Sequence, residues 1–359
     1  VQPPDGNHLE ESGGDGGMMW EIAKLGDISK NIQTGPFGSQ LHQSDYSECG
    51  IPVVMPKDLV GGKISEESIA RVDKTHVERL CRHKIEVGDI LYSRRGDVGR
   101  CAHVTKKEEG WLCGTGCLRV TIDSEKADSR FVFFQLQHPD TVGWVEKHAV
   151  GATMLNLNTT ILSSVPIRLP TLEIQKRIAD ILSAYDDLIE NNQKQIKLLE
   201  EAAQRLYKEW FVDLRFPGHE NTKIVDGVPE GWSRTNINGI LTFHRGYDLT
   251  KNEMKAGRYP VVGSTTVIGY HNEFKIKGPG IVTGHSGSLG KYQFIWDNFW
   301  PHNTSLYISD YKDHNIFFVY SLLQTVDFAS LNNGGAIPTL NRNVLSNIEV
   351  IEPEKKLQD

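Results

Sequence analysis

The sequence has no long apolar run. Hydrophobic residues make up 38% of its 359 residues and charged residues 24%. No stretch approaches the ~20 apolar residues that cross a bilayer, and the first residues lack the basic start and apolar core of a secretory signal. We therefore expect a cytoplasmic protein with no membrane segment. A chain of this length exceeds one ordinary hydrophobic core and suits two domains.

Cysteine is scarce and scattered. Of the five cysteines, Cys49, Cys81 and Cys101 stand alone, and only Cys113 and Cys117 lie close together. An odd, scattered set argues against a disulfide framework. No second pair follows Cys113 and Cys117 at a spacing typical of a zinc site. We expect reduced, buried thiols and no metal site.

A complete catalytic motif is also missing. Pro3-Pro4-Asp5 does not match a methyltransferase signature, and Pro139-Asp140 has no correctly spaced acidic-x-Lys partner because Glu146 and Lys147 are adjacent. The segment Gly284–Lys291 is similar to a phosphate-binding loop, but its glycines are one residue too far apart. The thirteen histidines form no HExxH motif. We expect no catalytic residue in this chain.

Positive charge is not in excess, since 39 Lys and Arg face 46 Asp and Glu and the net charge is −7. That balance alone does not indicate a nucleic-acid partner. Part of the acidity lies in residues 1–18, which have many glycines and no Lys or Arg. We expect this segment to be a disordered tail or an added remnant, with Met18 or Met19 as the natural start.

Most of the sequence instead consists of an internal repeat of two copies. The matched segments occur in the same order in both halves: Trp20–Ile22 with Pro229–Ser233, Gly50–Val54 with Arg258–Val262, Ile90–Arg100 with Ile281–Lys291, and Leu157–Ser163 with Leu340–Ser346. Each copy then reaches a proline, Pro170 or Pro353, followed by Ile174-Gln175 or Leu357-Gln358. A period this long predicts two domains of one fold.

Within each copy the pattern is α+β with a twisted sheet. Alternating or β-branched runs predict strands at Ile51–Met55, Cys117–Ile122 and Val165–Leu169. Short helices are expected at Asp128–Gln137 and His314–Leu323. Gly-Asp and Gly-Ser pairs mark tight turns between them.

Between the copies lies a segment of another kind. Residues 172–212 contain no Gly or Pro, and Pro217-Gly218 ends the segment. Apolar side chains recur at alternating steps of four and three, the spacing of a coiled coil. We expect a helix roughly 60 Å long, with Asn192 interrupting a seam formed for a partner helix by Ile174, Ile178, Ile181, Tyr185, Leu188, Leu199, Leu206 and Trp210.

These features together resemble the specificity subunit of type I restriction–modification enzymes. The segment Tyr207–Gly218 looks like the end of that family's first spacer helix, and Leu169–Gln175 resembles its entry. The resemblance implies two similar target-recognition domains separated by a long coiled-coil helix. The expected division is a tail (1–18), domain 1 (19–170), the spacer helix (171–213), a linker (214–228), domain 2 (229–353) and the start of a truncated second spacer helix (354–359).

The resemblance also implies a function. Each domain would read one half of a split target in double-stranded DNA, and the helix would set the gap between the halves. Adenine methylation, translocation and cleavage would belong to methyltransferase and restriction subunits, and S-adenosylmethionine, ATP and Mg to those partners alone. In the family, a second spacer helix follows domain 2 and packs against the first. A second copy of this chain, associating through its spacer helix, could supply that helix. The alternative is a coiled-coil scaffold that binds proteins, which the negative charge favours.

The DNA-contact candidates lie on turns. Arginine on a Gly-rich turn can reach a groove and pair with guanine or phosphate. The equivalent turn of the second copy and two further loops supply the rest, and the full set is Lys57, Arg94, Arg95, Arg100, Asn156, His285, Ser286, Lys291, Asn303 and Arg342. Asn158 and Asn341 occupy the same place in both copies, so we interpret them as parts of a shared structural turn. A solvated hairpin is the alternative for the arginine turn.

Overall fold

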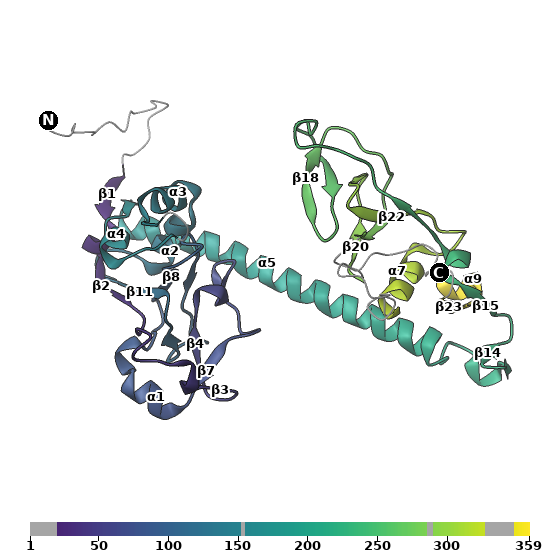
Figure 1. Cartoon of the computed structure of the whole chain (residues 1–359), viewed down its shortest axis with the longest axis horizontal. Coiled ribbons are helices and arrows are strands. Elements are labelled where there is room, and N and C mark those ends of the chain that lie inside the picture. Colours follow the sequence, from purple (N-terminus) through teal and green to yellow (C-terminus); the bar gives the residue numbers. More distant parts are fainter. Residues whose placement is uncertain (1–19, 152–154, 286–289, 327–347) are drawn as a thin grey trace. The chain divides into compact units, whose positions relative to one another are not determined.

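The computed structural model describes residues 20–151, 155–285, 290–326 and 348–359 (Figure 1). The chain divides into two compact units, Val1–Asn191 and Asn192–Asp359, which are described separately. The predicted tail and two DNA-contact candidates, Ser286 and Arg342, lie outside the described residues, as does Asn341.

The first unit is built on two four-stranded sheets. One has the order β2-β11-β8-β9 and the other β10-β4-β7-β3, and separate two-stranded pairs are β1-β12 and β5-β6. The strands are β1 (Glu21–Lys24), β2 (Ser29–Thr34), β3 (Tyr46–Ser47), β4 (Ile51–Val54), β5 (Leu59–Val60), β6 (Lys63–Ile64), β7 (Ala70–Val72), β8 (Ile90–Ser93), β9 (Cys101–His103), β10 (Leu112–Cys113), β11 (Cys117–Ile122) and β12 (Pro166–Leu169).

Helices cover these sheets. Figure 1 shows α2, α3 and α4 grouped beside β2, β8 and β11, whereas α1 lies near β3, β4 and β7. The helices are α1 (Lys74–Arg79), α2 (Ser129–Gln137), α3 (Pro139–His148) and α4 (Thr159–Ser163), with short 3-10 turns at Leu25–Ile28, Gln43–Asp45, Pro56–Asp58 and Cys81–His83. The largest core cluster joins Tyr92 and Leu118 of the first sheet to Val132 and Leu136 of α2. Burial of these apolar faces holds the unit together.

The second unit repeats this plan. Its sheets have the orders β16-β22-β19-β20 and β18-β17-β21, and its two-stranded pairs are β15-β23 and β13-β14. Its elements are β13 (Ile224–Val225), β14 (Val228–Pro229), β15 (Ser233–Asn236), α6 (Ile237–Ile240), β16 (Thr242–Arg245), β17 (Tyr259–Val262), β18 (Val267–His271), β19 (Gly280–Gly284), β20 (Tyr292–Ile295), β21 (Trp300–Pro301), β22 (Ser305–Asp310), α7 (Ile316–Thr325), β23 (Glu349–Glu352) and α9 (Lys355–Gln358), with a 3-10 turn at His219–Asn221.

The duplication predicted from the sequence is confirmed by strand pairing. The four-stranded sheet has the same order in both units, with β2, β11, β8 and β9 replaced by β16, β22, β19 and β20. A short parallel pair also recurs, because β4 pairs with β10 as β17 pairs with β21. Two α+β units of one topology therefore flank, in the sequence, one long helix.

That helix is α5 (Leu172–Tyr207), 36 residues that span about 54 Å at 1.5 Å per residue. It continues as one π-helical turn, Lys208–Val212, in which the Asp213 amide donates to the Lys208 carbonyl at 2.8 Å. The helical part of the predicted segment 171–213 is thus confirmed. Among the described residues, no helix combines the length and apolar character needed to span a membrane.

The seam predicted along α5 lies on a different side of the helix from the residues through which α5 packs against each unit. Near its start, Gln175 and Ala179 are buried, while the seam residues Ile174 and Ile178 are half-buried. Near its end, Tyr207 is buried and its ring centroid lies 5.7 Å from that of Phe318 in α7. Between the ends, five seam residues are exposed in this single chain: Ile181, Tyr185, Leu188, Leu199 and Leu206.

Candidate nucleic-acid interface

In the first unit, the arginine turn after β8 is hydrogen-bonded to two other loops. The Arg94 amide donates to the Gly116 carbonyl and the Leu157 amide donates to the Arg94 carbonyl, both at 2.8 Å. Arg95 and Asn156 form an antiparallel bridge. The structure therefore brings together Arg94, Arg95 and Asn156, which the sequence separates by about sixty residues.

Two further loops join at the same end of the sheet. The loop after β2 packs closely on the loop after β10, since a Cβ atom at Gly35 would collide with the Gly114 carbonyl. Thr115 Oγ1 donates to the Pro36 carbonyl at 3.0 Å. A Cβ at Gly116 would lie 3.2 Å from Pro56, the residue before Lys57. We name this meeting point the first loop cluster, residues 35–41, 56–58, 94–100, 114–116 and 155–157.

The cations of the first loop cluster differ in how far they are already paired. Arg100 Nε donates to Asp97 at 2.6 Å, and Lys57 Nζ donates to the Ser68 carbonyl at 2.7 Å. Among the described residues, the exposed side chain of Arg95 has no hydrogen bond or ion pair, and Arg94 Nε is buried without a hydrogen-bond partner. Because arginine stays charged at any physiological pH, two guanidinium groups are available to an anion or a base edge.

Asn156 adds an unused acceptor beside them. Its side-chain Oδ1 is buried and has no hydrogen-bond partner among the described residues. Buried polar atoms are normally satisfied in folded proteins, and an unsatisfied one costs about 1–3 kcal/mol. Both unsatisfied atoms of the first loop cluster, Arg94 Nε and Asn156 Oδ1, are therefore suited to a polar ligand that supplies an acceptor and a donor.

The second unit forms an equivalent cluster with different side chains. The His285 amide donates to the Thr304 carbonyl at 3.1 Å, in the place of the Arg94–Gly116 bond. The loop after β16 packs on the loop after β21, because a Cβ at Gly246 would collide with the His302 carbonyl. We name residues 246–251, 285, 290–291 and 302–304 the second loop cluster. Of the predicted contact residues it contains His285, Lys291 and Asn303.

The side chains of the second loop cluster bond more to one another. Asn303 Nδ2 donates to the Asp248 carboxylate, and Arg245 Nε donates to the Asn303 carbonyl at 3.0 Å. Thr283 Oγ1 donates to the Lys291 carbonyl at 2.9 Å, which ties the start of β20 to the end of β19. Asn303 is thus held in place by its neighbours, whereas Arg94 and Arg95 are not.

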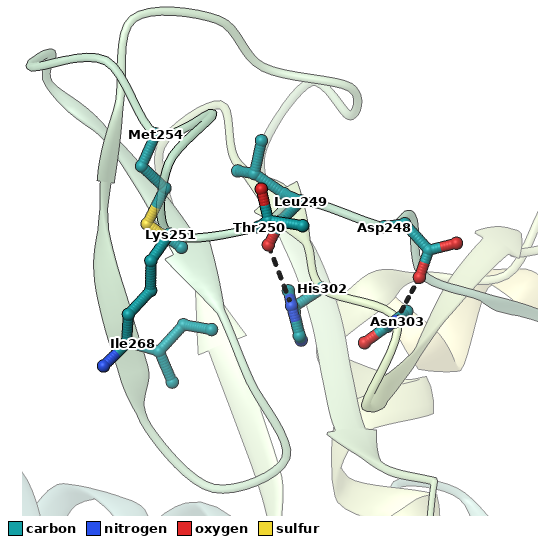
Figure 2. A pocket seen from close by; sticks show the side chains of 8 residues that line it. All are labelled: Asp248, Leu249, Thr250, Lys251, Met254, Ile268, His302 and Asn303. Atoms are coloured by element: carbon teal, nitrogen blue, oxygen red, sulfur yellow. Dashed lines mark hydrogen bonds between the residues drawn. The ribbon is translucent and has the colours of Figure 1, made fainter.

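A pocket of about 450 Å³ adjoins the second loop cluster. Figure 2 shows the residues that line it, with Met254, Lys251 and Ile268 on one side and Leu249 and His302 on the other. His302 Nε2 lies 3.3 Å from the Leu249 carbonyl. An apolar recess with few polar groups at its rim can accept a methyl group or a ring edge.

The cysteines and histidines form no comparable site. The expected burial is seen for Cys101, Cys113 and Cys117, but it is wrong for Cys49 and Cys81, which are exposed. Burial raises the pKa of the Cys113 thiol to about 12, so that thiol is inert at neutral pH. Within the part of the chain that the structure describes, no group of three or more His, Cys, Asp or Glu side chains could hold a metal ion. Asn158 caps α4 by accepting from the Ile161 amide at 2.8 Å, as expected of a structural turn.

Several residues of these clusters were not predicted from the sequence. Phe37, 54% exposed in the loop after β2, is one, and Tyr247 and Lys251 in the loop after β16 are others. The repeat contained the signal, because β2 and β16 are each followed by a glycine, Gly35 or Gly246, with an aromatic side chain one or two residues later. Aligning those glycines would have found both loops.

The sequence matches one family model in two segments. Residues 18–201 and 229–359 match the model described as type I restriction modification DNA specificity domain. The two segments together include most of the chain, and the gap between them falls at the end of α5 and in the predicted linker.

Curated relatives carry matching names. The chain is 28% identical to the type I restriction enzyme MjaIX specificity subunit of Methanocaldococcus jannaschii, over 66% of this chain and 54% of that protein. It is 27% identical to the type I restriction enzyme HindI specificity subunit of Haemophilus influenzae, over 54% of this chain and 41% of that protein. The chain thus spans about half the length of the curated relatives it matches.

A solved structure has a similar fold. The crystal structure of a type I restriction-modification system S subunit from M. genitalium matches with a TM-score of 0.60, covering 94% of this chain and 86% of that one. At 18% sequence identity this match concerns the fold alone. It agrees with the two α+β units and the long helix described above.

Proposed function

The chain belongs to the type I restriction modification DNA specificity family, and on that premise we propose that it reads a split sequence in double-stranded DNA. One loop cluster reads each half of the target. The chain itself carries no catalysis and directs adenine methylation and restriction by partner subunits.

The observation that carries this proposal is the recurrence of one loop cluster at the same strand ends in both units. In the first, Arg94 and Arg95 are charged groups with no partner among the described residues. Arginine pairs with guanine edges through two hydrogen bonds and with phosphates through charge. In the second, His285 stands where Arg94 stands and Asn303 lies beside it. Because the reading side chains differ, we expect the two half-sites to differ in sequence.

The helix α5 has the role of a spacer and a docking surface in this proposal. A helix converts residue number into distance, so its 36 residues set the gap between the half-sites. Its exposed apolar seam is the surface for the methyltransferase subunits or for a second copy of this chain. The restriction and translocase subunit joins through that assembly, S-adenosylmethionine, ATP and Mg act in the partners, and the complex works in the cytoplasm.

The test is a map of methylated adenines in cellular DNA. Cells that contain the cognate methyltransferase subunit are compared with and without this chain. We expect a new split motif of fixed gap that is methylated only when the chain is present. A variant carrying Arg94→Ala and Arg95→Ala together should methylate less and relax base preference in one half of the motif only.

The alternative function, a coiled-coil scaffold for proteins, predicts a different outcome. No new motif would appear, and binding of this chain to duplex DNA would not weaken steeply as salt is raised, which is the signature of phosphate contacts. Assembly with the methyltransferase subunit, checked by co-purification, separates a scaffold from a chain that fails to enter the complex.

A further inference from the structure

A buried glutamine lies at the junction between the first unit and α5. Gln175, in the first turn of α5, is only 1% exposed. Its side-chain Nε2 donates to the Pro170 carbonyl at 2.9 Å. Its Oε1 accepts from the backbone amide of Asp128 at 3.0 Å. One side chain therefore joins Pro170, which follows β12 and precedes α5, to the N-terminus of α2.

The same arrangement recurs in the second unit. Gln358, at the corresponding place in α9, donates through Nε2 to the Pro353 carbonyl at 3.0 Å. Its Oε1 accepts from the backbone amide of Asn315 at 3.2 Å. Asp128 and Asn315 are also equivalent, because each is the N-cap residue of the following helix, α2 or α7. The two units differ at most other sequence positions, but both keep this set of bonds.

The chemistry of the junction requires a side chain that both donates and accepts. The proline carbonyl needs a donor and the N-cap amide needs an acceptor, and the primary amide of glutamine offers both in one plane. Glutamate has no donor at neutral pH, and leucine of similar size has neither group. We name the three residues Gln175, Pro170 and Asp128 the first clamp, and Gln358, Pro353 and Asn315 the second clamp.

Neighbouring contacts fix the same joint from a second side. Ala179, one turn after Gln175, is fully buried. Arg130 of α2 reaches Asp180 of α5 at 2.8 Å and Asp128 at 3.4 Å. In the second unit, Asn315 Nδ2 donates to Asp359 at 3.1 Å. The first two turns of α5 are thus held on the first unit, while the apolar seam further along remains exposed.

We infer that Gln175 is a positioning residue that fixes the direction in which α5 leaves the first recognition unit, and thereby the gap that the protein accepts between half-sites. Gln358 makes the same two bonds from the four-residue helix α9. This inference rests on the proposed function and adds the residue that sets its geometry. The glutamines touch no loop cluster: Gln175 bonds to Pro170 and Asp128, which lie outside the residues of the first loop cluster. Gln175 acts on the spacing of the two half-sites and leaves the sequence of each half-site unchanged.

The test uses the whole complex of this chain with its methyltransferase subunits. A library of targets holds both half-sites constant and varies the gap by one base pair at a time, and methylation of each member is sequenced. The variants are Gln175→Leu, which removes both bonds, Gln175→Glu, which keeps the acceptor and loses the donor, and Gln358→Leu. Val53→Ala, in a buried strand of the other sheet, is the control for lost stability alone.

The expected result concerns selectivity among gaps. The ratio of methylation at the preferred gap to that at gaps one base pair longer or shorter should fall about tenfold in Gln175→Leu, the scale of a lost hydrogen bond. The preferred half-site sequences should stay the same. Val53→Ala should lower the melting temperature and leave the gap ratio as in the wild type.

Two other outcomes are distinguishable. A wild-type complex that shows no split motif overturns the proposed function itself. A wild-type complex with one preferred gap, whose ratio is unchanged in folded Gln175→Leu, overturns the positioning role alone. If Gln175→Leu does not fold, by circular dichroism, Gln175→Glu carries the test, because it keeps the acceptor for the Asp128 amide and loses only the donor to the Pro170 carbonyl. Gln358→Leu, which leaves the α5 junction intact, should keep the wild-type gap ratio.

Discussion

Arg94 and Arg95 are neighbours in the sequence but differ in their surroundings. Arg94 is half-buried with its Nε unsatisfied, and Arg95 is exposed. A half-buried guanidinium with an unsatisfied N–H is suited to a directional bond with a base edge, whereas an exposed one is suited to a phosphate. The two residues should therefore respond differently to removal.

Replacing Arg94 with alanine should relax base preference at one position of one half-site, by roughly 10- to 100-fold in discrimination. Arg95→Ala should weaken binding to all sequences equally and lower the slope of log affinity against log salt by about 1. Binding of the assembled complex to labelled duplexes at several salt concentrations measures both. Arg79→Ala, which removes an arginine paired with Asp45 elsewhere in the unit, is the control.

His103 supports a prediction on pH. Burial lowers its pKa to about 4, and its ring faces Ser129, with 3.0 Å between Nε2 and Oγ. The unfolded chain takes up the proton near pH 6.5, before the folded chain does. The folded state therefore favours the neutral ring of His103. Its contribution to the free energy of unfolding is fully present above about pH 6.5 and is lost as the pH falls from 6.5 toward 4.

We expect His103→Gln to flatten the dependence of the melting temperature on pH between 6.5 and 4, measured by circular dichroism. His219→Gln, a half-exposed histidine of the second unit, is the matched control. An equal pH dependence in wild type and His103→Gln would show that other groups cause it.

At this scale the sequence predicted residue types better than residue surroundings. The arginines and Asn156 were found because charged and amide side chains stood on a Gly-rich turn or beside a repeat. Which of them is already paired could not be predicted, since the Arg100–Asp97 pair and the isolation of Arg95 depend on side-chain placement. Phe37 and Tyr247 escaped notice because an exposed aromatic residue has no pattern of its own.

Among the elements, α5 is notable for a face that no described residue of the chain covers. Leu199 is 70% exposed and Leu188 is 54% exposed on the predicted seam. Burying such side chains against a partner helix contributes about 1.5–3 kcal/mol each. A charge placed there should weaken assembly without touching either recognition unit.

We expect Leu199→Asp to reduce co-purification with the methyltransferase subunit at least tenfold. Lys197→Asp introduces the same residue two positions earlier, on the opposite side of the helix, and should assemble normally. The melting temperature of each isolated variant tests whether the units remain folded. Equal assembly of both variants would exclude the seam as the docking surface.

The elements that the sequence predicted are those with strong periodicity. Strands β4, β11 and β12, helices α2 and α7, and nearly the whole of α5 lie where the pattern placed them. The parallel pairing of β4 with β10 was not predicted, because strands of two residues leave almost no pattern. The π-helical turn at Lys208–Val212 was also missed, because it lies where Tyr207 and Phe211 pack against Phe318, a contact between residues far apart in the sequence.

For the whole molecule, the proposed function makes the length of α5 the quantity that sets the gap between half-sites. Deleting one helical turn, residues 191–194, shortens the helix by about 6 Å, close to two base-pair steps of ~3.4 Å. We expect the preferred gap of the assembled complex to shorten by about two base pairs, measured by methylation of a gap library.

Deleting the heptad 191–197 keeps the apolar seam in phase and serves as a second length point, with a shift of about three base pairs. A gap that does not change in either deletion, in complexes that still assemble, would remove the spacer role of α5.

The two-unit architecture followed from the sequence because the matched segments keep one order along the chain. How the loops of each unit meet did not follow, because Arg94 contacts Gly116 and Leu157 only after the strands between them have paired. Such contacts join residues far apart in sequence, and local patterns do not report them.

The bond that joins the turn after β8 or β19 to its neighbouring loop runs between backbone atoms in both clusters. The Arg94 amide meets the Gly116 carbonyl, and His285 and Thr304 make the same bond with unrelated side chains. Backbone bonds place no demand on side-chain identity, so substitutions at these positions alter chemistry without altering the framework. Over evolutionary time a lineage can acquire a new target by changing a few surface residues, or by exchanging one whole unit for another that ends in the same glutamine junction.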